Sequence, residues 1–328
     1  MIIIRALDYF DIPKIRKMTE YLGADDSDRF AKELKTEAVR LIHSCLPLKY
    51  KFLPESYVLV SNKEILGLIT VLPTMGNPYK IVITRLIFQN NLYDVGKQLV
   101  EFVIARYGAM GAVAFSVSVD NSHDELFDLF MSGCGFRHCS CENMWKVENF
   151  NRKEFEPAKF RACQNSDAKQ VSDLYNSELT PLYKPSLTRI KTEFKEPFFE
   201  GITNFYKNRY VLEDYISHRV IAYLSIMTSD NTNFIVDLTT NAGYNLFYDE
   251  ILSFAFLEIS RRKTNFYVFL KQKKYTNNSE KFEKYLTSKG FQCIQTQNIL
   301  VKDFYRPVRQ TENSLKVFLF GEQSIASN

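Results

Sequence analysis

The stretch that decides the fold is MIIIRALDYFDIPKI at residues 1–15, because its outline returns at residues 157–171 as PAKFRACQNSDAKQV. An arginine, an aspartate and a branched apolar residue keep their spacing in both stretches: Arg5, Asp11 and Ile15, then Arg161, Asp167 and Val171. A Gly-Phe pair also recurs, at 135–136 and 290–291. A repeat of this length is a whole domain rather than a solenoid unit. We therefore expect two copies of one domain, at residues 1–150 and 151–328.

The bulk composition fits two ordinary globular domains. At 328 residues, with 45% apolar and 24% charged residues, each half is long enough to bury its own core. The net charge of +4 is spread along the chain and does not indicate nucleic acid as a partner. No apolar run approaches the roughly 20 residues of a membrane span, and the apolar start is too short for a secretory signal. We expect a cytoplasmic protein.

The six cysteines show neither the spacing nor the histidine neighbours that a zinc site needs. We expect reduced, structural thiols and no bound metal.

Both halves predict the same order of elements: a strand, one or two helices, three strands, a helix, a strand, a helix and a final strand. Asp11 and Asp167 are predicted N-caps of the first helix in each half. Alternating apolar residues around polar turns predict the hairpins. The predicted hairpins are at 57–72 and 210–226, and the third strands are at 81–88 and 234–240. The helices that follow are predicted at 95–107 and 248–261, and the buried strands after them at 112–119 and 265–272. The charged segment at 149–159 is the predicted linker.

This repeated order, with its Gly-Phe near the end of each copy, resembles the GNAT superfamily of N-acyltransferases in a tandem arrangement that covers nearly the whole chain. The resemblance implies an α/β (α+β) fold in which each copy is a mixed, mostly antiparallel sheet flanked by helices. It also implies that the sheet is splayed between its fourth and fifth strands, where an acyl-thioester cofactor enters.

The family holds the cofactor pyrophosphate at the start of the helix after the fourth strand. Its motif there is a Gln or Arg, then any two residues, a Gly, any one residue, and a Gly or Ala. The first copy matches this motif partly at 91–96, where Asn91 and Gly96 fit and Asp94 replaces a glycine. The second copy has Gly243, Leu246 and Tyr248 at the motif positions and keeps less of it. The alternative for 91–96 is a plain turn between strand and helix. The resemblance places the cofactor contacts in the first copy, at Leu86, Ile87, Asn91, Val95, Gly96, Lys97 and Asn121.

Acyl transfer to an amine needs a base for the ammonium proton and an acid for the leaving thiolate. The family often uses as its acid a tyrosine five residues before the Phe of the last Gly-Phe. Met131 and Leu286 occupy that position here, and Tyr285, next to Leu286, is our candidate acid. The alternative is that Tyr285 only packs on an amphipathic helix.

Asp237 is our candidate base, because it interrupts the apolar strand FIVDLTT at 234–240. A carboxylate there is expected either to be paired or to have a raised pKa, and the second state suits a base. The alternative is that Asp237 faces solvent. Arg85 takes the nearly equivalent place in the first copy and cannot act as a base. Catalysis is therefore predicted in the second copy, and donor binding in the first.

The function that these features predict is transfer of an acyl group from acyl-CoA, or from an acyl-carrier-protein thioester, to a primary amine of a small molecule or peptide. The aromatic segment 179–206 lies where the family forms its acyl and acceptor wall, although its rings could simply pack the core. Some tandem members attach fatty acyl chains to lysine or ornithine side chains of ribosomally made peptides, which is the narrower alternative. A different class of function also fits, namely a non-catalytic acyl-CoA-binding or protein-interaction module.

Overall fold

The computed structural model describes residues 2–19, 54–62, 64–74, 76–88, 93–196 and 206–304. The first copy contains β1 (Ile2–Ala6), α1 (Ile12–Thr19), β2 (Glu55–Ser61), β3 (Glu64–Thr74), β4 (Asn77–Phe88), α3 (Tyr93–Ala109), β5 (Ala114–Asp120), α4 (Asp124–Asp128) with a π-helical turn (Leu129–Gly133), and β6 (Arg137–Val147). The second copy contains β7 (Arg161–Ala162), α5 (Ala168–Glu178), α6 (Lys184–Leu187), β8 (Tyr206–Glu213), β9 (Val220–Thr228), β10 (Asn233–Thr240), α7 (Tyr248–Arg262), β11 (Tyr267–Lys273), α8 (Ser279–Ser288) and β12 (Gln292–Asp303).

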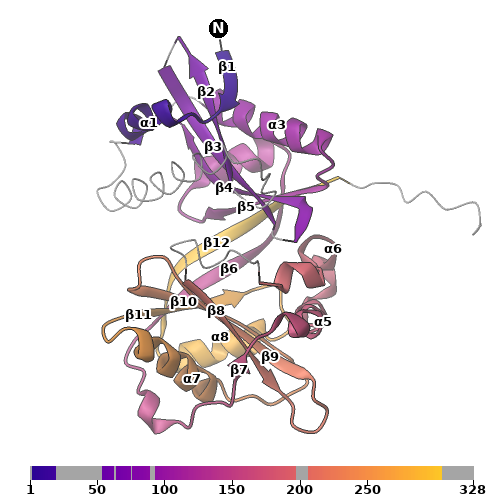
Figure 1. The fold of residues 1–328 in the computed structure, drawn as a ribbon, viewed down its shortest axis with the longest axis vertical. Coiled ribbons are helices and arrows are strands. Elements are labelled where there is room, and N and C mark those ends of the chain that lie inside the picture. Colours follow the sequence, from indigo (N-terminus) through magenta and orange to yellow (C-terminus); the bar gives the residue numbers. More distant parts are fainter. Residues whose placement is uncertain are drawn as a thin grey trace, which may run out of the picture.

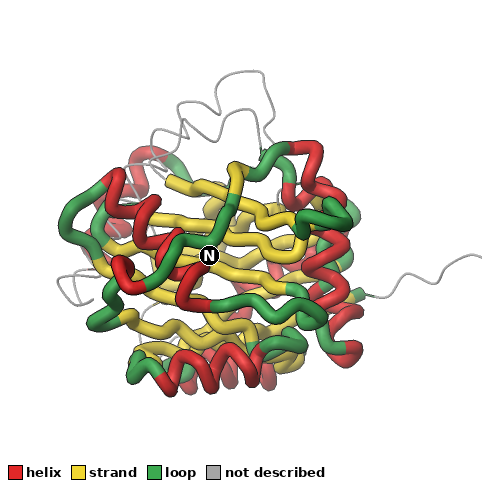
Figure 2. The backbone as a smooth tube through the Cα atoms, turned by 90° about the horizontal axis from the view of Figure 1, so that it is seen from below, coloured by secondary structure: helices red, strands yellow, loops and turns green. Residues whose placement is uncertain are grey.

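The twelve strands of the described residues form one sheet, in the order β1-β2-β3-β4-β5-β12-β6-β11-β10-β9-β8-β7. Neighbouring strands are antiparallel except for β4 with β5 and β10 with β11. The sheet runs through both halves of the molecule, and helices flank it on both sides (Figures 1 and 2). The predicted fold class, a mixed and mostly antiparallel sheet flanked by helices, is confirmed.

The two copies exchange their last strands. β12, the last strand of the second copy, pairs with β5 of the first copy from Ala114 to Asp120. β6, the last strand of the first copy, pairs with β11 of the second copy from Val268 to Lys273. The two exchanged strands also pair with each other, so they lie side by side at the centre of the sheet (Figure 1). Each half of the sheet is therefore completed by a strand from the other copy.

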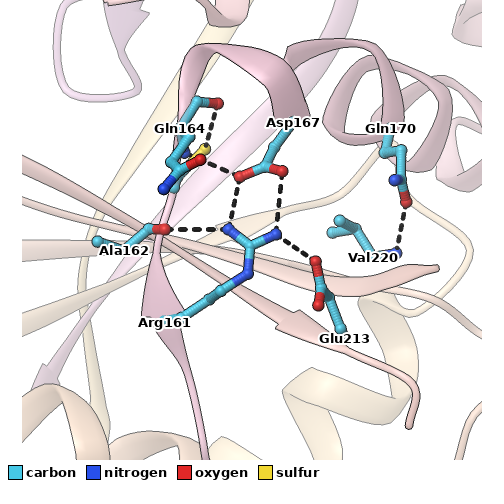
Figure 3. Close-up of polar contacts among 8 residues, drawn as sticks. Arg161, Ala162, Gln164, Asp167, Gln170, Glu213 and Val220 are labelled. Carbon is cyan, nitrogen blue, oxygen red and sulfur yellow. Dashed lines mark hydrogen bonds and ion pairs between the residues drawn. The ribbon is translucent and has the colours of Figure 1, made fainter. Parts of the chain in front are cut away.

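The repeated arginine and aspartate form the same ion pair in both copies. The Arg161 guanidinium donates to both carboxylate oxygens of Asp167, at 2.7 and 3.0 Å (Figure 3). Asp167 also accepts a hydrogen bond from the backbone N–H of Gln164, at 2.8 Å. Arg5 and Asp11 make the matching contacts at 2.5 and 2.8 Å. The repeat thus ties the first strand of each copy to the start of its first helix.

Asp167 occupies the predicted N-cap position of its helix, but it does not cap that helix with its side chain. The helix α5 starts at Ala168, and the Asp167 side chain makes no cap hydrogen bond to it. The carboxylate instead turns back toward the strand, because Arg161 offers it two charge-assisted hydrogen bonds.

Candidate functional site

Each copy has one place where its two parallel strands separate. In the first copy, residues 80–83 of β4 pair with residues 114–117 of β5, and the pairing of these two strands ends there. β4 then continues to Phe88 beside β3, while β5 continues to Asp120 beside β12. We call the diverging stretches, 84–88 of β4 and 118–120 of β5, the first splay.

A β-bulge lies at the point where the first splay begins. Thr70 of β3 is opposite Arg85, and the next residue, Val71, is opposite Ile83. Thr84 is therefore an extra residue on β4 without a partner across the ladder. Bulges bend the strand that carries them and increase its twist, which turns β4 away from β5.

Two of the predicted cofactor contacts, Leu86 and Ile87, lie on β4 in the first splay. Their backbones are in register with Ile69 and Leu68 of β3 on one side. Among the described residues, no strand pairs with the other edge of β4 beyond Ile83. This edge faces the splay, so its backbone groups are placed to bond an extended ligand.

The other predicted contacts surround the start of α3. Val95 and Gly96 are buried there, and Lys97 is half-buried, with its ammonium 4.0 Å from the Glu101 carboxylate. A Cβ on Gly96 would lie 2.9 Å from the Phe88 ring and 2.9 Å from Leu129, so this glycine lets α3 pack closely on β4. That role differs from the phosphate approach that the motif predicts.

The remaining two predicted contacts are Asn91, which lies outside the described residues, and Asn121, which follows β5. Asn121 accepts a hydrogen bond from the Asn298 amide at 3.2 Å, and its backbone N–H donates to Thr296 at 2.9 Å. Both contacts hold Asn121 against the exchanged strand β12.

The second splay, residues 238–240 of β10 and 272–273 of β11, has a different construction. Residues 233–237 of β10 pair with residues 267–271 of β11, and beyond them the two strands diverge. The pairing of β9 with β10 is uninterrupted, so the described part of β10 has no bulge.

Hydrogen bonds from the chain itself cross this second splay. The Asn278 amide donates to the Thr240 carbonyl at 2.8 Å. The backbone N–H of Ala242 donates to the Glu178 carboxylate at 3.0 Å, and Leu179 forms a β-bridge with Thr276. The end of α5 therefore closes over the place where the two strands separate.

Asp237 occupies the last paired position before the second splay. Its neighbours Val236 and Leu238 pack with α7 and α8, so the Asp237 side chain points to the opposite face of the sheet, toward α5. There the Asp237 carboxylate lies 2.5 Å from the Lys273 ammonium, and its side chain is 17% exposed.

Of the two states expected for Asp237, paired or with a raised pKa, the paired state is the one found. Burial raises the pKa of Asp237, but the Lys273 and Lys271 ammonium groups outweigh burial and hold the pKa below its ordinary value. A carboxylate in this state accepts a proton poorly near neutral pH.

A second ion pair continues this charged row across the sheet. Lys271 Nζ lies 2.5 Å from Glu142 of the exchanged strand β6, and the Tyr275 hydroxyl donates to the same carboxylate at 2.6 Å. The α5 side of the second splay is therefore filled by paired charges.

Tyr285, the candidate acid, lies on α8 and donates its hydroxyl to Asp249 of α7 at 2.7 Å. Burial and the Asp249 carboxylate both raise the pKa of Tyr285. Tyr285 packs against the core on the α7 and α8 side, whereas Asp237 points to the α5 side. The structure does not bring these two residues together.

The two splays are also far from each other. β5, β12, β6 and β11 separate β4 from β10, and at about 4.8 Å between strands the splays are on the order of 20 Å apart. β5 and β11 run in opposite directions, so the splays open toward opposite ends of the sheet. Asp237 therefore cannot act on a thioester bound in the first splay.

Two residues of this region are not among the predicted site residues, although the sequence pattern around each indicates which face of its helix or strand it occupies. Glu178 follows Val171, Leu174 and Tyr175 at helical spacing, which places a carboxylate on the buried face of α5. Lys273 lies two residues after Lys271 on β11, on the face opposite Val268 and Leu270, which places its ammonium on the same face as Asp237.

None of the helices in the described part of the chain is long and apolar enough to cross a membrane. The described residues also include no cluster of three or more potential metal ligands.

No protein-family model and no curated protein matches the sequence. Among solved structures, a tandem GNAT protein from the clavulanic acid biosynthesis pathway is similar, with a TM-score of 0.57 and 10% identity over 92% of this chain and 98% of its own. A GCN5-related N-acetyltransferase from Sphaerobacter thermophilus has a TM-score of 0.56 and 10% identity, over 94% of this chain and 98% of its own. Likeness at this level of identity is evidence of the fold.

Proposed function

We propose that this protein, which has the tandem GNAT fold, transfers an acyl group from coenzyme A or a carrier-protein thioester to a primary amine. The proposal places the donor in the first splay. The observation that carries it is the difference between the two splays: β4 has a bulge at Thr84 and an open backbone edge, whereas the second splay is closed by α5.

The chemistry of the donor suits the first splay. The arm of an acyl-thioester cofactor is an extended chain with amide groups, and such chains bind to unpaired strand edges through main-chain hydrogen bonds. Helix α3 starts at Tyr93, five residues after β4 ends, and the N-terminal N–H groups of a helix are suited to bind phosphate. Asp94 in the first turn of α3 is exposed, so water can screen its charge.

The roles of Asp237 as base and Tyr285 as acid belong to an alternative in which the second splay holds the donor. That alternative requires Lys273 to release Asp237 and the end of α5 to move away from Thr276. It also requires Tyr285 to leave Asp249. We therefore favour the first splay.

Hydrogen exchange with and without coenzyme A tests the location of the donor. We expect slower exchange of backbone amides in peptides that cover 84–99, with peptides covering 238–252 unchanged. Protection of 238–252 alone would support the alternative site and contradict the first splay.

Turnover is a separate measurement. The full chain is incubated with acyl-CoA of several lengths and a mixture of primary amines, and thiol release and the mass of the acylated amine are followed. We expect both signals to rise together. Binding of acyl-CoA without turnover would favour the non-catalytic module, which Met131 and the paired Asp237 support.

A fatty acyl donor and a lysine or ornithine side chain of a peptide are the narrower form of this proposal. The aromatic segment gives it limited support, because Phe194 is buried against Tyr175 and Tyr223 and packs the core. Phe198, Phe199 and Phe205 lie outside the described residues. A preference for long acyl chains in the turnover measurement would support this form.

A further inference from the structure

A small pocket in the second splay is lined by one carboxylate, several hydroxyl groups and two aromatic rings. Its free volume is about 20 Å³, and it is not sealed from solvent. That volume holds one group the size of a water molecule. The lining residues that matter below are Glu178, Thr240, Tyr248, Ser279 and Phe282.

Glu178 is a buried carboxylate with one unused oxygen. The residue is 4% exposed, and Oε1 accepts a hydrogen bond from the backbone N–H of Ala242. Oε2 is buried and has no hydrogen-bond partner among the described residues. Burial raises the pKa of Glu178, so its ionised form is unfavourable here, and a donor or cation bound at Oε2 would stabilise that form.

The lysines that line this pocket do not supply that donor. Lys273 contacts Asp237 at 2.5 Å and Thr239 at 3.1 Å, and Lys271 contacts Glu142 at 2.5 Å. Both lysine ammonium groups that line the pocket thus contact another carboxylate, and among the described residues Glu178 forms no ion pair.

We propose that this pocket binds the ammonium head of a primary alkylamine. One N–H would donate to Glu178 Oε2, and the others to hydroxyl oxygens such as those of Thr240 and Ser279. The rings of Tyr248 and Phe282, whose centroids are 4.9 Å apart, line the same pocket and offer a surface for the cation and its alkyl chain.

The size of the pocket selects this class of ligand. A free volume near that of one water admits an –NH3+ head with its chain directed outward. It excludes a quaternary ammonium head, which is larger and has no N–H to donate. Binding of the amine is measured directly and does not depend on acyl transfer.

Calorimetric titration of the full chain with n-butylammonium chloride tests the site. We expect saturable binding to one site, with no binding of n-butanol, which lacks the charge, or of tetramethylammonium, which lacks the donors. Glu178→Gln should weaken binding by about tenfold or more, as expected for loss of a hydrogen bond to a charged group. Glu280→Gln, an exposed glutamate on α8, is the matched control and should bind as the unaltered chain does. Equal binding by both variants would overturn the proposal.

A second measurement keeps the test valid if Glu178→Gln does not fold. In the unaltered chain, the NMR signal of the Ala242 amide reports on the Glu178 carboxylate, since it donates to it. n-Butylammonium should shift this signal more than the amides of Val95 and Gly96 in the first copy. An unchanged Ala242 signal, or an equal shift with sodium or potassium chloride alone, would contradict the amine site.

Discussion

Lys273 holds Asp237 at 2.5 Å while its ammonium also donates to Thr239 at 3.1 Å, so one lysine of β11 fixes two residues of β10. The Lys273 side chain is 5% exposed and the Asp237 side chain 17%. The lysine cannot simply turn to solvent when its partner is removed. This arrangement gives the carboxylate a structural role whatever its part in chemistry.

We therefore expect Asp237→Asn to lower the free energy of unfolding by about 3 kcal/mol, because it leaves a buried ammonium without a counter-charge. The double variant Asp237→Asn, Lys273→Met removes both charges and should recover most of that loss. Urea unfolding of the three proteins is the measurement. An Asp237→Asn protein that is as stable as the unaltered chain but inactive in acyl transfer would instead establish the role of a base.

The ion pair of Arg161 with Asp167 predicts a pH dependence of stability. Hydrogen bonds from Arg161 hold the pKa of Asp167 below its ordinary value, more strongly than burial raises it. The stabilisation is therefore complete above the ordinary carboxyl pKa of about 4 and is lost as the pH falls through the lower folded value.

Replacement of this arginine, as in Arg161→Met, should lower stability at neutral pH by about 1 kcal/mol, because Arg161 is 41% exposed and the pair is partly screened. The difference from the unaltered chain should shrink at acid pH. Urea unfolding at several pH values checks this. A difference that stays constant down to the lowest pH would show that the arginine acts by packing alone.

The fluorescence of Trp145 can be used to observe the strand exchange. It is the single tryptophan of the sequence and belongs to β6 of the first copy. Its ring is buried in the core of the second half, where it donates to Gln272 at 2.8 Å. Expressed alone, residues 1–150 should show the fluorescence of a hydrated indole, and addition of residues 151–328 should return it to that of a buried one. Buried emission from 1–150 alone, as a monomer, would contradict this dependence.

The repeat and the order of elements could be predicted from the sequence because they rest on local patterns. Arg5 with Asp11 and Arg161 with Asp167 are close in sequence, and apolar alternation marks most strands. The strand exchange could not be predicted, since β6 and β12 have similar patterns and either could pair with β5. The sequence indicates which face of its strand Lys273 occupies, but its contact with Asp237 could not be predicted, because only the pairing of β10 with β11 brings the two residues together.

Substitution by alanine should have opposite effects on stability at two glycines of α3. A Cβ on Gly96 meets Phe88 and Leu129 at 2.9 Å, whereas a Cβ on Gly108 meets nothing within 4 Å. Alanine is favoured over glycine in helices by about 1 kcal/mol, so Gly108→Ala should stabilise the protein by up to that amount. Gly96→Ala should destabilise it by about 1 to 2 kcal/mol, because overpacking outweighs the gain in helix propensity. Urea midpoints of the two variants decide the matter, and a stabilised Gly96→Ala protein would show that the start of α3 is not packed on β4 as described.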